Sequence, residues 1–229
     1  STACEMDCRY CAQRAQRRGR RATLSPDALA RLFHDLLRAR KVEGLFLSSA
    51  IAGNSVTAMD RLLATGELLR RRYRYRGYLH LKILPGAERA QVEAAAALAT
   101  RISVNLEAPT ARALAHLSRR KALVADLMTR LTWAAEATAH RPGRSLTTQF
   151  VVGAADETDR ELLHLCAWLY QKRRLGRAYF SPFSPIDDTP LENSPPTPRL
   201  RQHRLYQADF LLRQYPFTLD DLPLDDQQN

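Results

Sequence analysis

Strand-like and helix-like segments alternate along this chain, and the alternation limits its possible folds more than any other feature. Apolar runs at residues 42–49 and 78–84 are each followed by a segment whose apolar residues recur at helical spacing. Strands separated by helices pair in parallel, because each helix returns the chain to the same edge of the sheet. The pattern therefore predicts an α/β fold with a parallel sheet.

The boundaries of these segments follow from local chemistry. The five expected strands are residues 42–49, 78–84, 101–107, 147–153 and 177–183. Three helix starts carry capping residues: Ser25 stands before Pro26, Thr57 opens the second helix, and Thr158 forms a capping box with Glu161. A long proline-rich loop and a last helix over residues 200–215 complete the expected core.

Three cysteines near the start of the chain, Cys4, Cys8 and Cys11, have the spacing C-x3-C-x2-C. Three thiolates on a four-iron cluster leave one iron open to another ligand. Two other readings stay open from the residues alone: a zinc site completed by a histidine such as His34 or His80, or three reduced thiols. The sequence has no second pair of zinc ligands at the usual spacing, which favours the cluster.

The fourth cysteine and the overall composition place the protein in a broad class. Cys166 falls on the apolar face of a helix, so we expect it to be buried rather than to bind metal. Four cysteines, three of them clustered, favour a reducing compartment over a disulfide framework. No run of 18 apolar residues occurs, so we expect a cytosolic protein with no membrane partner.

The formal net charge of +11 favours a polyanionic partner such as nucleic acid. The basic residues occur in groups, and in residues 70–78 arginines alternate with tyrosines, a combination suited to phosphate contact and base stacking. The other groups are residues 14–21, 119–121 and 172–174. For any single group, solvated cations at a helix terminus are an equally good explanation.

The cysteine motif resembles that of the radical S-adenosylmethionine (SAM) superfamily. Phrases along nearly the whole chain are similar to one family within it, the radical SAM proteins assigned to DNA modification or repair. These phrases are residues 44–49, 78–82, 102–107, 148–149 and 203–209. The resemblance implies a [4Fe-4S] cluster on Cys4, Cys8 and Cys11, and S-adenosyl-L-methionine bound to its open iron. It also implies a uracil-DNA-glycosylase-like protein partner and a reductant protein.

The resemblance refines the expected fold and domain organisation. It implies a partial (β/α)6-type TIM-like barrel, the radical SAM core, with the active site at the carboxyl ends of the strands. Because the cysteine loop of such barrels follows their first strand, this chain is expected to lack that strand. We expect one core domain over residues 1–215 and an acidic tail over residues 216–229.

Site residues are expected at the ends of the strands. Ser48 and Ser49 stand where the superfamily has a Gly-Gly-Glu motif beside the methionine of SAM. Ser103, Asn105 and Glu107 share one face of a strand and are expected near the SAM carboxylate or ribose.

The fourth expected strand adds a second superfamily motif. Gln149, Val151, Gly153 and Asp156 align with the fixed positions of G-x-I-x-G-x-x-E, which places Gly153 against adenosine. Lys82 and Gln149, inward at strand ends, are candidates for orienting the substrate.

The leading hypothesis is a radical SAM enzyme that acts on DNA or another nucleic acid. A second hypothesis keeps the enzyme but makes the substrate a small molecule or a protein side chain. The third is a nucleic-acid-binding protein whose metal centre is structural.

Overall fold

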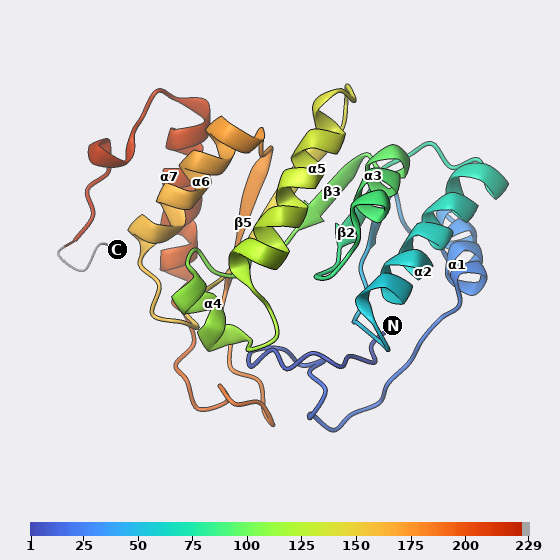
Figure 1. The fold of residues 1–229 in the computed structure, drawn as a ribbon, viewed down its shortest axis with the longest axis horizontal. Coiled ribbons are helices and arrows are strands. Elements are labelled where there is room, and N and C mark those ends of the chain that lie inside the picture. Colours follow the sequence, from blue (N-terminus) through green and yellow to red (C-terminus); the bar gives the residue numbers. More distant parts are fainter. Residues whose placement is uncertain (226–229) are drawn as a thin grey trace. The chain divides into compact units, whose positions relative to one another are not determined.

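The computed structural model describes residues 1–225, and it divides into two compact units. Unit 1 comprises residues 1–6, 13–104 and 129–146, and unit 2 comprises residues 7–12, 105–128 and 147 onward. Each unit contains parallel strands covered by helices (Figure 1). No helix within residues 1–225 is long and apolar enough to cross a membrane.

Unit 1 is built on three parallel strands in the order of the chain. They are β1 (Leu45–Leu47), β2 (Leu79–Ile83) and β3 (Arg101–Val104). Its helices are α1 (Pro26–Arg38), α2 (Ser55–Glu67), α3 (Arg89–Leu98) and α5 (Thr129–Ala139), with the short π-helix η1 (Leu68–Arg72) after α2. Helix α3 packs against both α2 and α5 and lies between them in Figure 1.

Strand β2 shows why this sheet has two different faces. Leu79, Leu81 and Ile83 alternate with His80 and Lys82, and the three apolar side chains are almost completely buried. Since successive strand residues point to opposite faces, the apolar side chains pack beneath helices α2 and α3. His80 and Lys82 lie on the other face, together with their register partners on β1 and β3.

Unit 2 pairs β4 (Ser145–Val152) with β5 (Arg177–Pro182) in parallel, although the first two residues of β4 belong to unit 1. Its other elements are α4 (Ala111–Leu117), η2 (Leu123–Met128), α6 (Asp159–Arg173), α7 (Arg199–Gln214) and η3 (Leu219–Asp221). Phe150 and Phe180 stack in its core with ring centroids 6.1 Å apart, and Tyr206 from α7 meets Phe180 edge-on at 5.3 Å.

The helix starts test the capping predictions directly. The Ser25 hydroxyl accepts a hydrogen bond from Ala28 N at the start of α1, as predicted. The capping box at the start of α6 is also present. The prediction for Thr57 is wrong, because α2 begins earlier and the Asn54 side chain accepts from the Thr57 backbone N at 2.8 Å.

The third strand ends earlier than its sequence pattern suggests. β3 stops at Val104, and Glu107 adopts a left-handed backbone with φ of 67°, which is rare for a residue with a Cβ atom. The alternation that put Ser103, Asn105 and Glu107 on one face therefore does not continue through Glu107. Ser103 belongs to unit 1, whereas Asn105 and Glu107 belong to unit 2.

Candidate cofactor site

The first cysteine is held within unit 1 by its neighbour. Glu5 N donates to the Ile51 carbonyl, and the Glu5 carboxylate accepts from Gly53 N, both at 2.8 Å. These two bonds fix the half-buried Cys4 close to the loop that follows β1. The loop is the one in which the sequence predicted contacts to the methionine of SAM.

The two predicted serines lie in that loop. The Ser49 hydroxyl donates to the Ala50 carbonyl at 2.8 Å and lies 3.2 Å from Ser1 N. Ser48 is exposed. Both hydroxyls are positioned by the end of β1, and their role toward SAM stays a prediction.

The other two cysteines lie on one turn of unit 2. Cys11 N donates to the Cys8 carbonyl at 3.3 Å, and the Cys8 thiol is buried while Cys11 is half-buried. The Asp7 carboxylate accepts from the Ser118 hydroxyl at 2.6 Å, which holds the start of this turn against the end of α4. Burial raises the pKa of the Cys8 thiol, with Glu107 raising it further, while the nearby Lys121 cation opposes the rise.

A buried ion pair lies next to this turn. Lys121 Nζ is 3.3 Å from Glu107 Oε1, and each side chain is 7% exposed. Burial lowers the pKa of Lys121, but the combined effect of Glu107, Tyr10 and Cys8 outweighs it and raises this pKa well above its ordinary value. The lysine is therefore a permanent cation within unit 2.

Tyr10, which precedes Cys11, interacts electrostatically with the ion pair of Lys121 and Glu107. Burial and the Glu107 charge raise the pKa of Tyr10 well above its usual range, so its hydroxyl is neutral. The sequence did not predict this ion pair, because it placed Lys121 in a basic group, residues 119–121, that was expected either to face a polyanion or to be solvated. The only local signal was the polar Glu107 at the end of a buried strand pattern.

The backbone of Glu107 is tied to β4. Glu107 N donates to the Gln149 carbonyl at 3.0 Å, and Val151 N donates to the Glu107 carbonyl at 2.8 Å. Gln149, a predicted substrate-orienting residue, is half-buried on this strand, and so is Asn105, which precedes the bridge to β4. A left-handed residue held in this way aims its side chain where an extended one could not.

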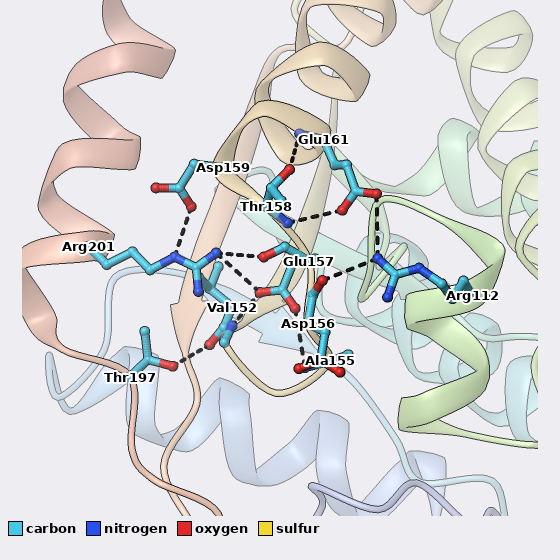
Figure 2. A network of polar contacts seen from close by, with 11 residues as sticks. Arg112, Val152, Ala155, Asp156, Glu157, Thr158, Asp159, Glu161, Thr197 and Arg201 are labelled. Carbon is cyan, nitrogen blue, oxygen red and sulfur yellow. Dashed lines mark hydrogen bonds and ion pairs between the residues drawn. The ribbon is translucent and has the colours of Figure 1, made fainter. Parts of the chain in front are cut away.

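The loop after β4 is organised by a buried carboxylate. Figure 2 shows Glu157 between the backbone of its own loop and Arg201 of α7. Its side chain is 1% exposed; it accepts from Gly153 N and from Ala155 N, the latter at 3.2 Å. Arg201 Nη2 donates to the Glu157 carbonyl at 2.8 Å, and its Nε bonds the Asp159 carboxylate at the same distance.

The sequence motif put its acidic position at Asp156, whereas the carboxylate that accepts bonds from the loop is that of the neighbouring Glu157. Asp156 is exposed, has a left-handed φ of 40°, and contributes its carbonyl to Arg112 at 3.2 Å (Figure 2). The carboxylate that closes the loop therefore stands one residue later than the G-x-x-E pattern indicates. The signal that could have found it is the adjacent Asp-Glu pair itself.

Gly153 itself meets a strict requirement for glycine. Its φ is 82°, and a Cβ atom built there would lie 2.0 Å from the Thr197 hydroxyl. That hydroxyl donates to the Val152 carbonyl at 2.6 Å, so it cannot move away without losing a bond. Close packing against the chain explains this glycine, and its predicted contact with adenosine stays a prediction.

The remaining predicted residues, Lys82 and Ser103, lie on the non-helical face of the unit 1 sheet. Ser103 is buried, and its hydroxyl is 2.8 Å from His80 Nε2. Burial, with help from Arg101 and Lys82, lowers the pKa of His80 to about 4. A histidine that stays neutral at pH 7 keeps one ring nitrogen available as an acceptor.

The donor set suits an iron–sulfur cluster. Cys4, Cys8 and Cys11 all carry free thiols, and soft thiolates are the ligands that such clusters use. Within residues 1–225 no group of three histidine, cysteine, aspartate or glutamate side chains is close enough to hold a metal ion. The fourth cysteine, Cys166, is completely buried, as expected.

Comparison with known proteins assigns the chain to a family. The model of the radical SAM superfamily matches residues 1–169, which is most of the chain and includes all three clustered cysteines. The chain therefore belongs to the radical SAM superfamily. Members of this superfamily are enzymes that use a [4Fe-4S] cluster and S-adenosyl-L-methionine. No curated protein sequence matches the chain.

Several solved structures resemble this fold. HydG, a maturase of the [FeFe]-hydrogenase, matches with a TM-score of 0.72 and 13% identity over 93% of this chain and 48% of its own. Methylornithine synthase (PylB) matches with a TM-score of 0.73 and 12% identity, over 93% of this chain and 60% of its own. A radical SAM methyltransferase from Sphaerobacter thermophilus matches with a TM-score of 0.66 and 18% identity, over 94% of this chain and 62% of its own.

At these identities the likeness concerns the fold alone. It confirms the α/β prediction of five parallel strands in a partial TIM-like barrel. The chain spans about half the length of HydG and about three fifths of the other two proteins.

Proposed function

We propose that this chain is the core of a radical SAM enzyme whose substrate is a nucleic acid. The observation that carries the enzymatic part is the superfamily match across all three cysteines, Cys4, Cys8 and Cys11. A [4Fe-4S] cluster supplies the electron that splits a carbon–sulfur bond of SAM and yields a 5′-deoxyadenosyl radical. The three thiolates would hold that cluster and leave one iron for SAM.

The chain's own residues prepare this region. The Lys121 and Glu107 pair fixes one cation and one carboxylate beside the Cys8 turn, where low exposure keeps water out. Glu157 holds the loop after β4, and Gly153 allows that loop to pack closely. Ser49, Asn105 and Gln149 are proposed to contact SAM or substrate from the strand ends.

The nucleic-acid substrate rests on charge and aromatic residues. The net charge is +11, and in unit 1 the residues Tyr73, Arg74 and Arg76 line a surface hollow of about 380 Å³. Arginine beside tyrosine suits phosphate contact and base stacking. DNA modification or repair, and a uracil-DNA-glycosylase-like partner with a reductant protein, belong to the same proposal. The free thiols fit the reducing cytoplasm.

A small-molecule substrate is the second candidate. The fold matches that of methylornithine synthase, and this neighbour's name points to an amino-acid product. Under this candidate, the basic surface serves a protein partner instead of the substrate.

The test begins with the cofactor. Anaerobic reconstitution of the wild type should give about four irons per chain and 5′-deoxyadenosine formation from SAM with a strong reductant. Cys8→Ser should lose the iron and the product, whereas the matched control Cys166→Ala should keep both. Colourless protein that binds zinc instead would refute the enzymatic proposal.

The substrate class is tested by deuterium transfer. A deuterated oligonucleotide that passes deuterium into 5′-deoxyadenosine supports the nucleic-acid substrate. Transfer only from deuterated amino acids or peptides would support the second candidate and overturn the first.

A further inference from the structure

The non-helical face of the unit 1 sheet carries aromatic and basic side chains in a continuous row. Phe46 on β1 pairs in register with His80 on β2, which pairs with Arg101 on β3. Tyr78 and Lys82 flank His80 along the chain. We call these five residues the aromatic–basic face.

Two of its aromatic residues are exposed, Phe46 on β1 and Tyr78 just before β2. Phe46 is 58% exposed in the middle of its strand, while Leu47 beside it is 4% exposed. The ring centroid of Phe46 lies 4.4 Å from that of His80, and Tyr78 is 41% exposed. The two rings are tilted by 36° to each other, so the outer side of the Phe46 ring is left as an apolar surface, which is unfavourable in water unless a ligand covers it.

Its cations are positioned by the sheet. The Arg101 guanidinium lies 5.6 Å from the Tyr78 ring centroid, and its Nε bonds the Ser145 hydroxyl at 3.0 Å. Lys82 is half-buried and forms no ion pair with a carboxylate within the described part of the chain. None of the strand residues on this face is acidic, so the face is positively charged.

We propose that the aromatic–basic face binds one nucleotide of a single-stranded nucleic acid, with its base stacked on Phe46 and its phosphate held by Lys82 and Arg101. The inference rests on the proposed function, for which it names a binding surface for the substrate. A base provides a flat π-face for Phe46, and a phosphodiester provides the anion that two neighbouring cations favour. The same cations disfavour the positively charged sulfonium of SAM.

The neutral state of His80 fits this arrangement. Because burial and the neighbouring cations keep its pKa near 4, His80 adds no third charge at pH 7 and remains a ring against which Phe46 can rest. Its Nε2 is already occupied by the Ser103 hydroxyl. His80 therefore supports the ring of Phe46, while contact with the ligand falls to the exposed Phe46 itself.

The test measures binding of a fluorescent twelve-nucleotide oligo-dT to the reconstituted full chain by anisotropy at several salt concentrations. Phe46→Leu removes the ring but keeps an apolar side chain, and should weaken binding about tenfold or more. Lys82→Gln should weaken binding and reduce the slope of log K against log salt by about 0.7, as expected for one lost phosphate contact.

Two matched controls lie in unit 2. Phe210→Leu changes another exposed aromatic residue, on α7, and Lys172→Gln changes an exposed lysine on α6. Both should bind the oligonucleotide like the wild type. Equal binding by Phe46→Leu and Phe210→Leu would overturn the proposal, and so would binding of free thymidine monophosphate but not of the oligonucleotide.

A third result concerns the cofactor. If Phe46→Leu loses SAM affinity but keeps oligonucleotide affinity, the face belongs to SAM and the proposal is wrong. If the wild type makes no 5′-deoxyadenosine, the proposed function fails, whereas the binding measurements still decide the role of the aromatic–basic face.

Discussion

Truncation of Glu157 tests the organisation of the loop after β4. In Glu157→Ala, the backbone N–H groups of Gly153 and Ala155 lose their acceptor in a buried place. Each unsatisfied group costs about 1–3 kcal/mol. Arg201 keeps its bonds to the Glu157 carbonyl and to Asp159, so it adds little to this cost. For two such groups, we therefore expect a loss of about 2–6 kcal/mol in the free energy of unfolding.

The measurement is urea unfolding followed by circular dichroism, on preparations with equal iron content. Asp156→Asn is the matched control, because it removes the neighbouring exposed carboxylate and asparagine tolerates the left-handed backbone. This control should stay within about 0.5 kcal/mol of the wild type. Glu157→Gln keeps one acceptor oxygen, so its free energy of unfolding should lie between those of Glu157→Ala and Asp156→Asn. A Glu157→Ala protein as stable as Asp156→Asn would show that the carboxylate does not hold the loop.

Two further predictions concern His80 and Gly153. Because the pKa of His80 is lowered to about 4, the unfolded chain takes up its proton first, and stability should fall as the pH drops from about 6.5 to about 4. After allowance for partial exposure, this loss is about 1–2 kcal/mol, and it should be absent in His80→Gln when unfolding is measured across that range. Gly153→Ala should destabilise more than the control Gly143→Ala, because both glycines have positive φ but only Gly153 faces the Thr197 hydroxyl. Equal midpoints in urea for the two variants would contradict this explanation.

Helix caps could be predicted from the sequence because the residues that bond to each other are close along the chain. The caps of α1 and α6 depend on residues three positions apart, and both were predicted. The wrong prediction at the start of α2 also concerns residues three positions apart. Asn54 and Thr57 are both residue types that cap helices, and which of them begins α2 depends on where the loop after β1 ends. The strand expected within residues 78–84 is likewise present as β2.

Contacts between residues that meet only after the chain folds back on itself could not be predicted from the sequence. Glu107 and Lys121 are 14 positions apart, and they meet only because α4 folds the chain back on itself. In the sequence, Lys121 belonged to a basic group that could either face a polyanion or be solvated, and neither alternative pairs it with Glu107. The part played by Glu157 was also hidden, since its carboxylate meets Gly153 N and Ala155 N only after the loop that follows β4 has folded.

The same distinction applies to the net charge, because several cations predicted to face a polyanion are used by the fold. Arg21 donates to backbone carbonyls of Gln13, Arg14 and Arg17 at 2.7–2.8 Å. Arg70 donates to three other carbonyls. Substitution of either arginine would loosen a loop and thereby reduce the affinity for nucleic acid. In a binding measurement at one salt concentration, this effect would look the same as the loss of a phosphate contact.

The two causes separate on salt dependence. Removal of a phosphate contact lowers the slope of log K against log salt, whereas loosening of the fold lowers the affinity without a matching change in slope and also lowers the urea midpoint. Arg74 and Arg76 are exposed and line the hollow beside Tyr73, so their loss should change the slope and leave the midpoint alone. The charge that can serve a partner is therefore the part that the fold does not use, and that part is smaller than +11.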